Sequence, residues 1–131
     1  MSNSIIKTPI AHVWKDAEGI IHIKLIEASE VDEFDILDLN LVVRNLSKQQ
    51  PVLKLVDARC SWKISAKAKT KALEEDKLNK TIARAIIVSN SIKSTFFSFI
   101  KKFETTKCPQ KYFTDINQAH LWLLEIKNNI A

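Results

Sequence analysis

The first part of the chain alternates apolar and polar residues at the period of a β-strand. Residues 11–15 and 20–26 are two runs of strand length, and a four-residue turn separates them. The turn holds Gly19, the only glycine of the chain, where a tight turn most needs a positive φ. The pattern predicts a β-hairpin.

Helical spacing follows at residues 30–48. Ser29 precedes an acidic first turn, and Arg44 and Lys48 lie at the other end, as the helix dipole favours. The main apolar stripe is Val31, Phe34, Leu37 and Leu41, and a second set, Ile36, Leu39, Val43 and Leu46, widens it. We expect an amphipathic helix whose main stripe faces the core.

Short apolar runs alternate with capped helical segments after Pro51. Strands are expected at residues 52–57, 82–88 and 111–114, and helices at residues 66–78, at residues 92–103 and after residue 115. Because each run leads into a helix, the three strands should be parallel neighbours in one sheet. The order ββαβαβαβα predicts a single α/β domain, residues 1–131, with a mixed sheet and helices packed against it.

Polar residues mark the starts of these helices. Ser65 suits the N-cap of the helix at residues 66–78, and Asp115 with Gln118 resembles a capping box. The polar turn at residues 57–59 should lead directly into the helix at residues 66–78. In the last helix the inward residues would be Ile116, Ala119, Leu123 and Ile126.

The amino-acid composition excludes several classes of protein. Hydrophobic residues make up 46% and charged residues 27%, which excludes a disordered chain. No apolar run approaches the roughly 20 residues of a membrane-spanning helix, and the start lacks the features of a signal peptide. Cys60 and Cys108 form no CxxC pair and should lie at opposite ends of the sheet, so we expect free thiols and a cytoplasmic protein.

The net charge of +5 raises the question of an anionic partner. A basic ridge lies around the helix at residues 66–78 and comprises Lys63, Lys67, Lys69, Lys71 and Lys77. Acids follow it directly, and Lys71 is spaced to pair with Glu75. A solvated face is therefore favoured, and we expect no nucleic-acid partner.

The order of elements and several segments resemble the stage II sporulation protein AA-like, or STAS-type, domains, which are related to the CRAL-TRIO lipid-carrier domains. The segments are Leu55-Val56-Asp57-Ala58-Arg59, Ile64-Ser65-Ala66-Lys67-Ala68, residues 83–88, Phe96-Phe97, Cys108-Pro109, residues 111–115 and residues 119–123. Regulatory members carry a phosphorylatable serine in an Asp-Ser-Ser-Gly-type turn. Residues 57–62 lack that turn, so a phospho-switch does not carry over from the resemblance.

A polar edge is the first candidate binding site. Open α/β sheets bind ligands at the carboxyl ends of their strands, where helix N-termini present free N–H groups. The residues expected there are Asp57, Arg59, Ser61, Trp62, Ser65, Ser89, Asn90 and Ser91. The alternative is that the serines only cap helices and that Asp57 pairs with Arg59.

The helix at residues 92–103 is the second candidate. Ile92, Phe96, Phe99, Ile100 and Phe103 form one stripe, and Phe97 points away from it. Such a helix could cover an apolar ligand or dock a partner. The alternative is an ordinary core helix.

The three histidines give no catalytic or metal assignment. His12 and His22 could lie opposite each other across the hairpin, but no third metal ligand is evident. His120 has no serine or cysteine partner that the sequence identifies. We expect no catalytic residues, no metal and no cofactor.

These observations favour a non-enzymatic, cytoplasmic regulatory or binding module of STAS type. It would act on a protein partner through the polar edge and the helices after it, with a homodimer left open. The alternative is a carrier or sensor of a small apolar or lipid-like ligand beneath the helix at residues 92–103, with Phe96 and Phe97 at the site.

Overall fold

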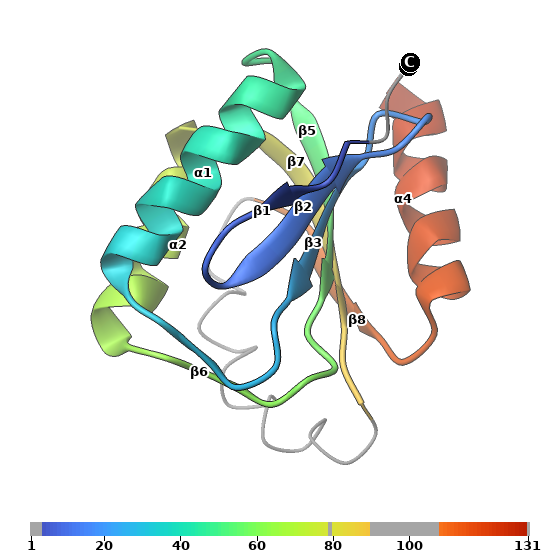
Figure 1. Ribbon diagram of the computed structural model, residues 1–131. Coiled ribbons are helices and arrows are strands. Elements are labelled where there is room, and N and C mark those ends of the chain that lie inside the picture. The colour runs from blue at the N-terminus through green and yellow to red at the C-terminus, as the bar shows by residue number, and fades with distance from the viewer. Residues whose placement is uncertain (1–3, 79, 90–107, 131) are drawn as a thin grey trace.

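The computed structural model describes residues 4–78, 80–89 and 108–130, with the side chains of residues 76 and 77 excepted. A six-stranded sheet forms its centre, in the order β1-β2-β3-β5-β7-β8. Helices α1 and α2 cover one face of the sheet and α4 covers the other (Figure 1). The described part of the chain is therefore a three-layer α/β fold, and the predicted fold class is confirmed.

The sheet is mixed, as predicted. Its antiparallel part is β1 (Ile6–Lys7), β2 (Ala11–Lys15) and β3 (Ile21–Leu25). Its parallel part continues from β3 through β5 (Val52–Asp57), β7 (Thr81–Ile87) and β8 (Gln110–Phe113). The three predicted parallel neighbours are thus confirmed.

Asp16 and Gly19 shape the turn of the β2–β3 hairpin. The Asp16 carboxylate accepts hydrogen bonds from the backbone N–H groups of Glu18 and Ile20, and Gly19 has a φ of +85°. In the resulting register Trp14 lies opposite His22, and His12 lies opposite Lys24. The suggested His12–His22 pairing across the hairpin is therefore wrong.

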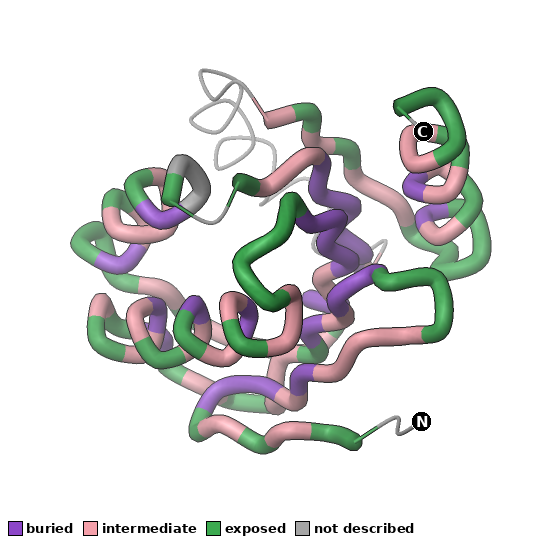
Figure 2. The backbone as a smooth tube through the Cα atoms, turned by 90° about the horizontal axis from the view of Figure 1, so that it is seen from above, coloured by how far each residue is buried: buried purple, intermediate pink, exposed green. Residues whose placement is uncertain are grey.

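Hydrophobic clusters lie on both faces of the sheet. Alternate residues of the strands point to opposite sides, so Val13 and Ile23 pack toward α1, while Leu55 and Ile87 pack toward α4. Figure 2 shows the buried residues running along the central strands between the helices. The sheet therefore separates the apolar residues that contact α1 from those that contact α4.

The start of the first helix differs from the prediction. Ser29–Val31 form a short strand, β4, which pairs in parallel with β6 (Trp62–Ile64). Helix α1 (Glu33–Ser47) begins later because Asp32 and Asp35 form a reciprocal capping box. Residues 57–59 consequently lead into β6 and not directly into a helix.

The buried face of α1 is also not the predicted one. Phe34 and Leu41 are 67% and 54% exposed, whereas Ile36, Asn40 and Val43 are buried. Apolar residues surround most of this helix, so their spacing alone did not identify the face that meets the sheet. The set expected only to widen the face supplies the core contacts.

Helix α2 (Ala66–Leu78) lies beside α1 and confirms its predicted bounds (Figure 1). Glu75 is buried and accepts a hydrogen bond from Arg44 of α1 at 2.9 Å. The predicted Lys71–Glu75 pair is therefore wrong, and Lys71 pairs with Glu74 instead. Two helices of the same layer are thus joined by a charge pair whose carboxylate is buried and whose guanidinium is partly exposed.

Helix α4 (Ile116–Ile130) packs on the opposite face, mainly against β7. Ala119 and Leu123 are fully buried, as predicted, and the Asp115 carboxylate accepts the N–H of Asn117. Ile116 is 37% exposed, so its predicted inward position is wrong. No helix among the described residues combines the length and the apolar character needed to cross a bilayer.

Candidate functional site: a cavity between the sheet and the α1–α2 layer

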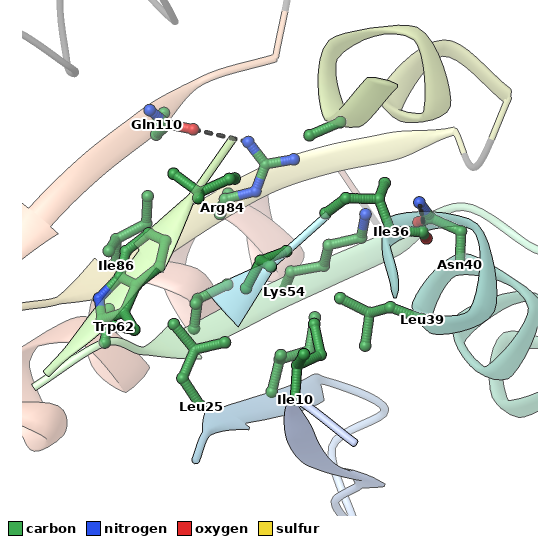
Figure 3. A pocket seen from close by; sticks show the side chains of 16 residues that line it. Ile10, Leu25, Ile36, Leu39, Asn40, Lys54, Trp62, Arg84, Ile86 and Gln110 are labelled. Atoms are coloured by element: carbon green, nitrogen blue, oxygen red, sulfur yellow. Dashed lines mark hydrogen bonds between the residues drawn. The ribbon is translucent and has the colours of Figure 1, made fainter. Parts of the chain in front are cut away.

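A cavity of about 130 Å³ lies between the sheet and helices α1 and α2. Its apolar lining comes from the strands of the sheet, from α1 and α2 and from β6 (Figure 3). Ile10 precedes β2, Ile23 and Leu25 belong to β3, and Ile36 and Leu39 belong to α1. Elements distant in the sequence thus build one apolar chamber.

Three polar side chains interrupt this apolar lining in a single row. Lys54 of β5 lies in register with Arg84 of β7, and Arg84 lies in register with Gln110 of β8. Lys54 and Arg84 are only 4% and 8% exposed, and both line the cavity. A row of two cations and one amide therefore crosses three parallel strands on the cavity face.

The amide of Gln110 fixes the Arg84 side chain. Arg84 Nη1 donates a hydrogen bond to Gln110 Oε1 at 2.6 Å, and Gln110 Nε2 donates one to the Tyr112 hydroxyl at 3.0 Å. Together these two hydrogen bonds orient the Gln110 amide so that its oxygen faces the Arg84 guanidinium. On the α1 side of the cavity, Asn40 is buried and donates from Nδ2 to the Ile36 carbonyl.

The described lining is positively charged. It contains Lys54 and Arg84 and, among the described residues, no aspartate or glutamate. Both cations make interactions within the protein, and an anionic group in the cavity would add a charge-assisted contact to these. The wall is suited to an anionic group beside an apolar one.

The predicted polar edge is held together by its own residues. Arg59 donates from Nε to Asp57 Oδ1 at 2.9 Å and from Nη2 to Asp57 Oδ2 at 2.7 Å. Burial alone would raise the pKa of Asp57, but the hydrogen bonds and the charge of Arg59 outweigh it and hold the pKa below its ordinary value. The alternative expectation, in which Asp57 pairs with Arg59, matches this geometry.

The serines near this edge have different surroundings. Ser65 Oγ accepts the backbone N–H of Ala68 and so caps α2, as predicted. Ser61 is exposed, and its backbone N–H donates to the Glu27 carboxylate at 2.7 Å. Ser89 follows the end of β7 and is partly buried.

Part of the predicted site cannot be placed. Asn90, Ser91, Phe96 and Phe97, together with the predicted helix at residues 92–103, lie outside the described residues. Among the predicted site residues that are described, Trp62 lines the cavity. Docking of a protein at the polar edge stays a prediction.

Sequence reasoning missed the cavity, although one signal pointed to it. Lys54 stands within the apolar run at residues 52–57, and Arg84 stands within the run at residues 82–88. A lysine or arginine in a strand that reads as fully buried is unusual and marks a special environment. The chamber itself requires the packing of α1, α2 and β6, which no local pattern specifies.

The thiols are free, as predicted. Cys60 Sγ lies 3.4 Å from the Leu25 carbonyl oxygen. Burial, and after it the negative charge of Glu27, raises the pKa of the Cys60 thiol. Cys60 is therefore poorly suited to act as a nucleophile.

Comparison with solved structures agrees with this architecture. The fold is similar to that of an uncharacterised protein of the DUF3478 family with a SpoIIAA-like fold, from Shewanella loihica PV-4. The two share 16% sequence identity with a TM-score of 0.65, over 94% of this chain and 98% of the other. The chain thus has a SpoIIAA-like fold, and the predicted resemblance is confirmed.

The family follows from the sequence match. Residues 13–127 match the model of a domain of unknown function, DUF7793, and the chain belongs to that family. A search of curated proteins gave no match.

Proposed function

We propose that this protein is a non-enzymatic binding module that holds a small apolar ligand with an anionic group in the cavity between the sheet and α1–α2. The observation that carries the proposal is the pair of cations, Lys54 and Arg84, in the wall of an otherwise apolar chamber. Few precisely placed polar groups in an apolar pocket are typical of small-molecule sites. This is the carrier or sensor alternative of the sequence analysis, argued here from a described lining that does not include residues 92–103.

The size of the cavity sets the size of the ligand. Its volume of about 130 Å³ is close to the roughly 150 Å³ of an engineered apolar cavity that binds benzene. One ring or a short aliphatic chain fits such a space. A small carboxylate or a similar anion is therefore the ligand class that fits the cavity.

The charge of the wall favours an anion over a neutral molecule. A carboxylate that accepts hydrogen bonds from Lys54 or Arg84 makes charge-assisted contacts, which are about twice as strong as neutral ones. A neutral alcohol of the same length gains the apolar contacts but only weaker hydrogen bonds. We expect the protein to discriminate between the two by about 1.5–3 kcal/mol, which is about 10- to 150-fold in affinity.

The chemistry of the described lining supports binding without reaction. It offers no hydroxyl, thiol, imidazole or carboxylate, which are the usual nucleophiles and general bases. The isolated thiols remain our reason for proposing a cytoplasmic location. A protein partner at the polar edge, sensing the loaded state, is compatible with this proposal.

Hexanoate and hexan-1-ol are suitable probes because they differ only in the charged group. We expect hexanoate to raise the melting temperature in a saturable manner and hexan-1-ol to do so much less. Lys54→Met removes the charge while keeping a similar length, so it should abolish most of this preference. Lys63→Met, at an exposed position of β6, is the matched control and should leave the preference unchanged.

A cavity-filling variant tests the place of binding. Ala72 of α2 lines the cavity, and Ala72→Leu should weaken hexanoate binding by at least about tenfold because the added atoms occupy the ligand's volume. Ala66→Leu, at an exposed position of the same helix, is its control. Equal affinity of Ala72→Leu and the native protein would contradict the proposal, as would equal binding of the acid and the alcohol.

A further inference from the structure

Three side chains from distant parts of the chain meet on the α4 side of the sheet. Asp16 lies in the β2–β3 turn, His22 in β3 and His120 in α4. His22 Nε2 lies 2.8 Å from Asp16 Oδ2, and His120 Nε2 lies 3.3 Å from the same oxygen. This Asp-His-His cluster is separate from the cavity, which lies on the opposite face of the sheet, next to α1 and α2.

The carboxylate of the cluster is held in place by the turn. Asp16 Oδ1 accepts the backbone N–H groups of Glu18 at 2.8 Å and Ile20 at 3.0 Å. This arrangement leaves Oδ2 directed at the two imidazoles. Contacts that orient a ligand in this way are typical of metal sites.

The two imidazoles are also positioned by their neighbours. The His22 ring stacks on Trp14, its cross-strand partner, with ring centroids 5.0 Å apart and an angle of 12°. His120 lies on α4, which is fastened to the same turn because Lys127 Nζ donates to the Glu18 carbonyl at 2.8 Å. The strand, the turn and α4 thus each contribute contacts in or near the cluster.

We propose that Asp16, His22 and His120 bind a divalent transition metal ion, with Zn²⁺ as the best fit. The donor atoms all lie within 4.8 Å of one another. In a tetrahedral zinc site with bonds of about 2.0–2.1 Å, ligand atoms are separated by about 3.3 Å. Small side-chain rotations therefore bring two nitrogens and one oxygen to coordination distance.

The donor set identifies the class of metal. Imidazole nitrogens with a single carboxylate suit Zn²⁺ and its neighbours in the first transition row, and not Ca²⁺ or Mg²⁺, which prefer oxygen ligands. Each imidazole binds as the neutral ring through Nε2, so the proton of that ring resides on Nδ1. The side chains are 21%, 13% and 32% exposed in the order Asp16, His22, His120, which leaves room for water as a fourth ligand.

His12 provides a matched control for the test. It is the third histidine of the chain and points to the same face of the sheet, but its register partner is Lys24. His12 does not belong to the group of mutually close donor atoms. His12→Gln should therefore leave metal binding unchanged.

The experiment is a titration of the metal-free protein with ZnCl₂ by calorimetry, repeated with CoCl₂ by visible absorption. We expect one Zn²⁺ per chain and the intense bands of four-coordinate Co²⁺. His22→Gln, His120→Gln and Asp16→Asn should each weaken binding by at least about tenfold. Circular dichroism spectra of the three variants check that they fold.

Two results would overturn the proposal. One is the absence of saturable binding by the native protein, in which case the cluster is only a hydrogen-bonded contact between α4 and the turn. The other is an equal loss of affinity in His12→Gln and His120→Gln, which would place the metal elsewhere. Because the cluster and the cavity lie on opposite faces of the sheet, either result leaves the hexanoate experiment unaffected.

Discussion

At the scale of single residues, the central strands of the sheet contain buried charged side chains. Asp57 at the end of β5 is neutralised by the two parallel hydrogen bonds of Arg59. Lys54, three residues earlier, lies in register with another cation, Arg84. The strand therefore carries one charge paired within the polar edge and one that faces the cavity beside a second cation.

Replacing Arg59 by alanine tests the balanced charge. The variant leaves the buried Asp57 carboxylate without its side-chain partner, which should lower the free energy of unfolding at pH 7 by about 1–3 kcal/mol. Arg59→Lys, which keeps the charge but not the paired geometry, should lose less. Urea unfolding of the three proteins at pH 7 measures both differences, and equal values would contradict the role of the pair.

The same pair predicts a pH dependence. The pKa of Asp57 is lowered on folding, so its contribution to stability is present above the unfolded pKa of about 3.9 and is lost as pH falls through the lower folded value. Arg59→Ala removes the side-chain hydrogen bonds and the charge of Arg59, while the backbone N–H of residue 59 and the charge of Lys24 remain. The pKa of Asp57 should therefore be lowered less, and the variant should lose less stability than the native protein on acidification from pH 5 to pH 3. A parallel decline of the two proteins would show that Asp57 is not the group involved.

At the scale of elements, the packing of α1 against α2 includes a buried polar contact. Helix α2 contributes few buried side chains, and one of them is Glu75, whose carboxylate accepts a hydrogen bond from Arg44 of α1. The Glu75 side chain is 4% exposed and that of Arg44 is 35% exposed. The helix layer that covers the cavity is thus held together in part by one charge pair, in which Glu75 is buried and Arg44 is partly exposed.

Because Glu75 and Arg44 differ in exposure, we expect substitutions of the two residues to have unequal effects on stability. Arg44→Met leaves a buried carboxylate without this partner and should cost about 1–3 kcal/mol of stability. Glu75→Gln should cost less, because Arg44 reaches water and the amide still offers an acceptor. Thermal or urea unfolding measures both, and a larger loss in Glu75→Gln would contradict the account.

The sequence predicted the elements that show a clear pattern and missed those of two or three residues. Residues 52–57 form an apolar run of strand length and residues 66–78 follow a capping serine, and both predictions were correct. β4 and β6 have three residues each, too few for a two-residue period to be read. In α1 apolar residues on most sides left the choice between Phe34 and Ile36 to tertiary packing.

The whole molecule presents two candidate sites on opposite faces of one sheet. The cavity lies on the α1–α2 side, and the Asp-His-His cluster lies between the β2–β3 turn and α4. Neither could be read from the sequence, because each depends on which side chains the topology brings together. His22 and His120 are 98 positions apart, and only the docking of α4 on the hairpin makes them neighbours.

The central claim is that a small anion occupies the cavity, and an NMR titration with isoleucine methyl labelling tests it most directly. Ile10, Ile23, Ile36 and Ile86 line the cavity, while Ile20 and Ile87 are fully buried on the α4 side. On addition of hexanoate the first four methyl signals should shift in a saturable manner while those of Ile20 and Ile87 stay in place, and Lys54→Met should require a much higher concentration. Unchanged signals at the four cavity residues, or equal shifts at Ile20 and Ile87, would contradict the account.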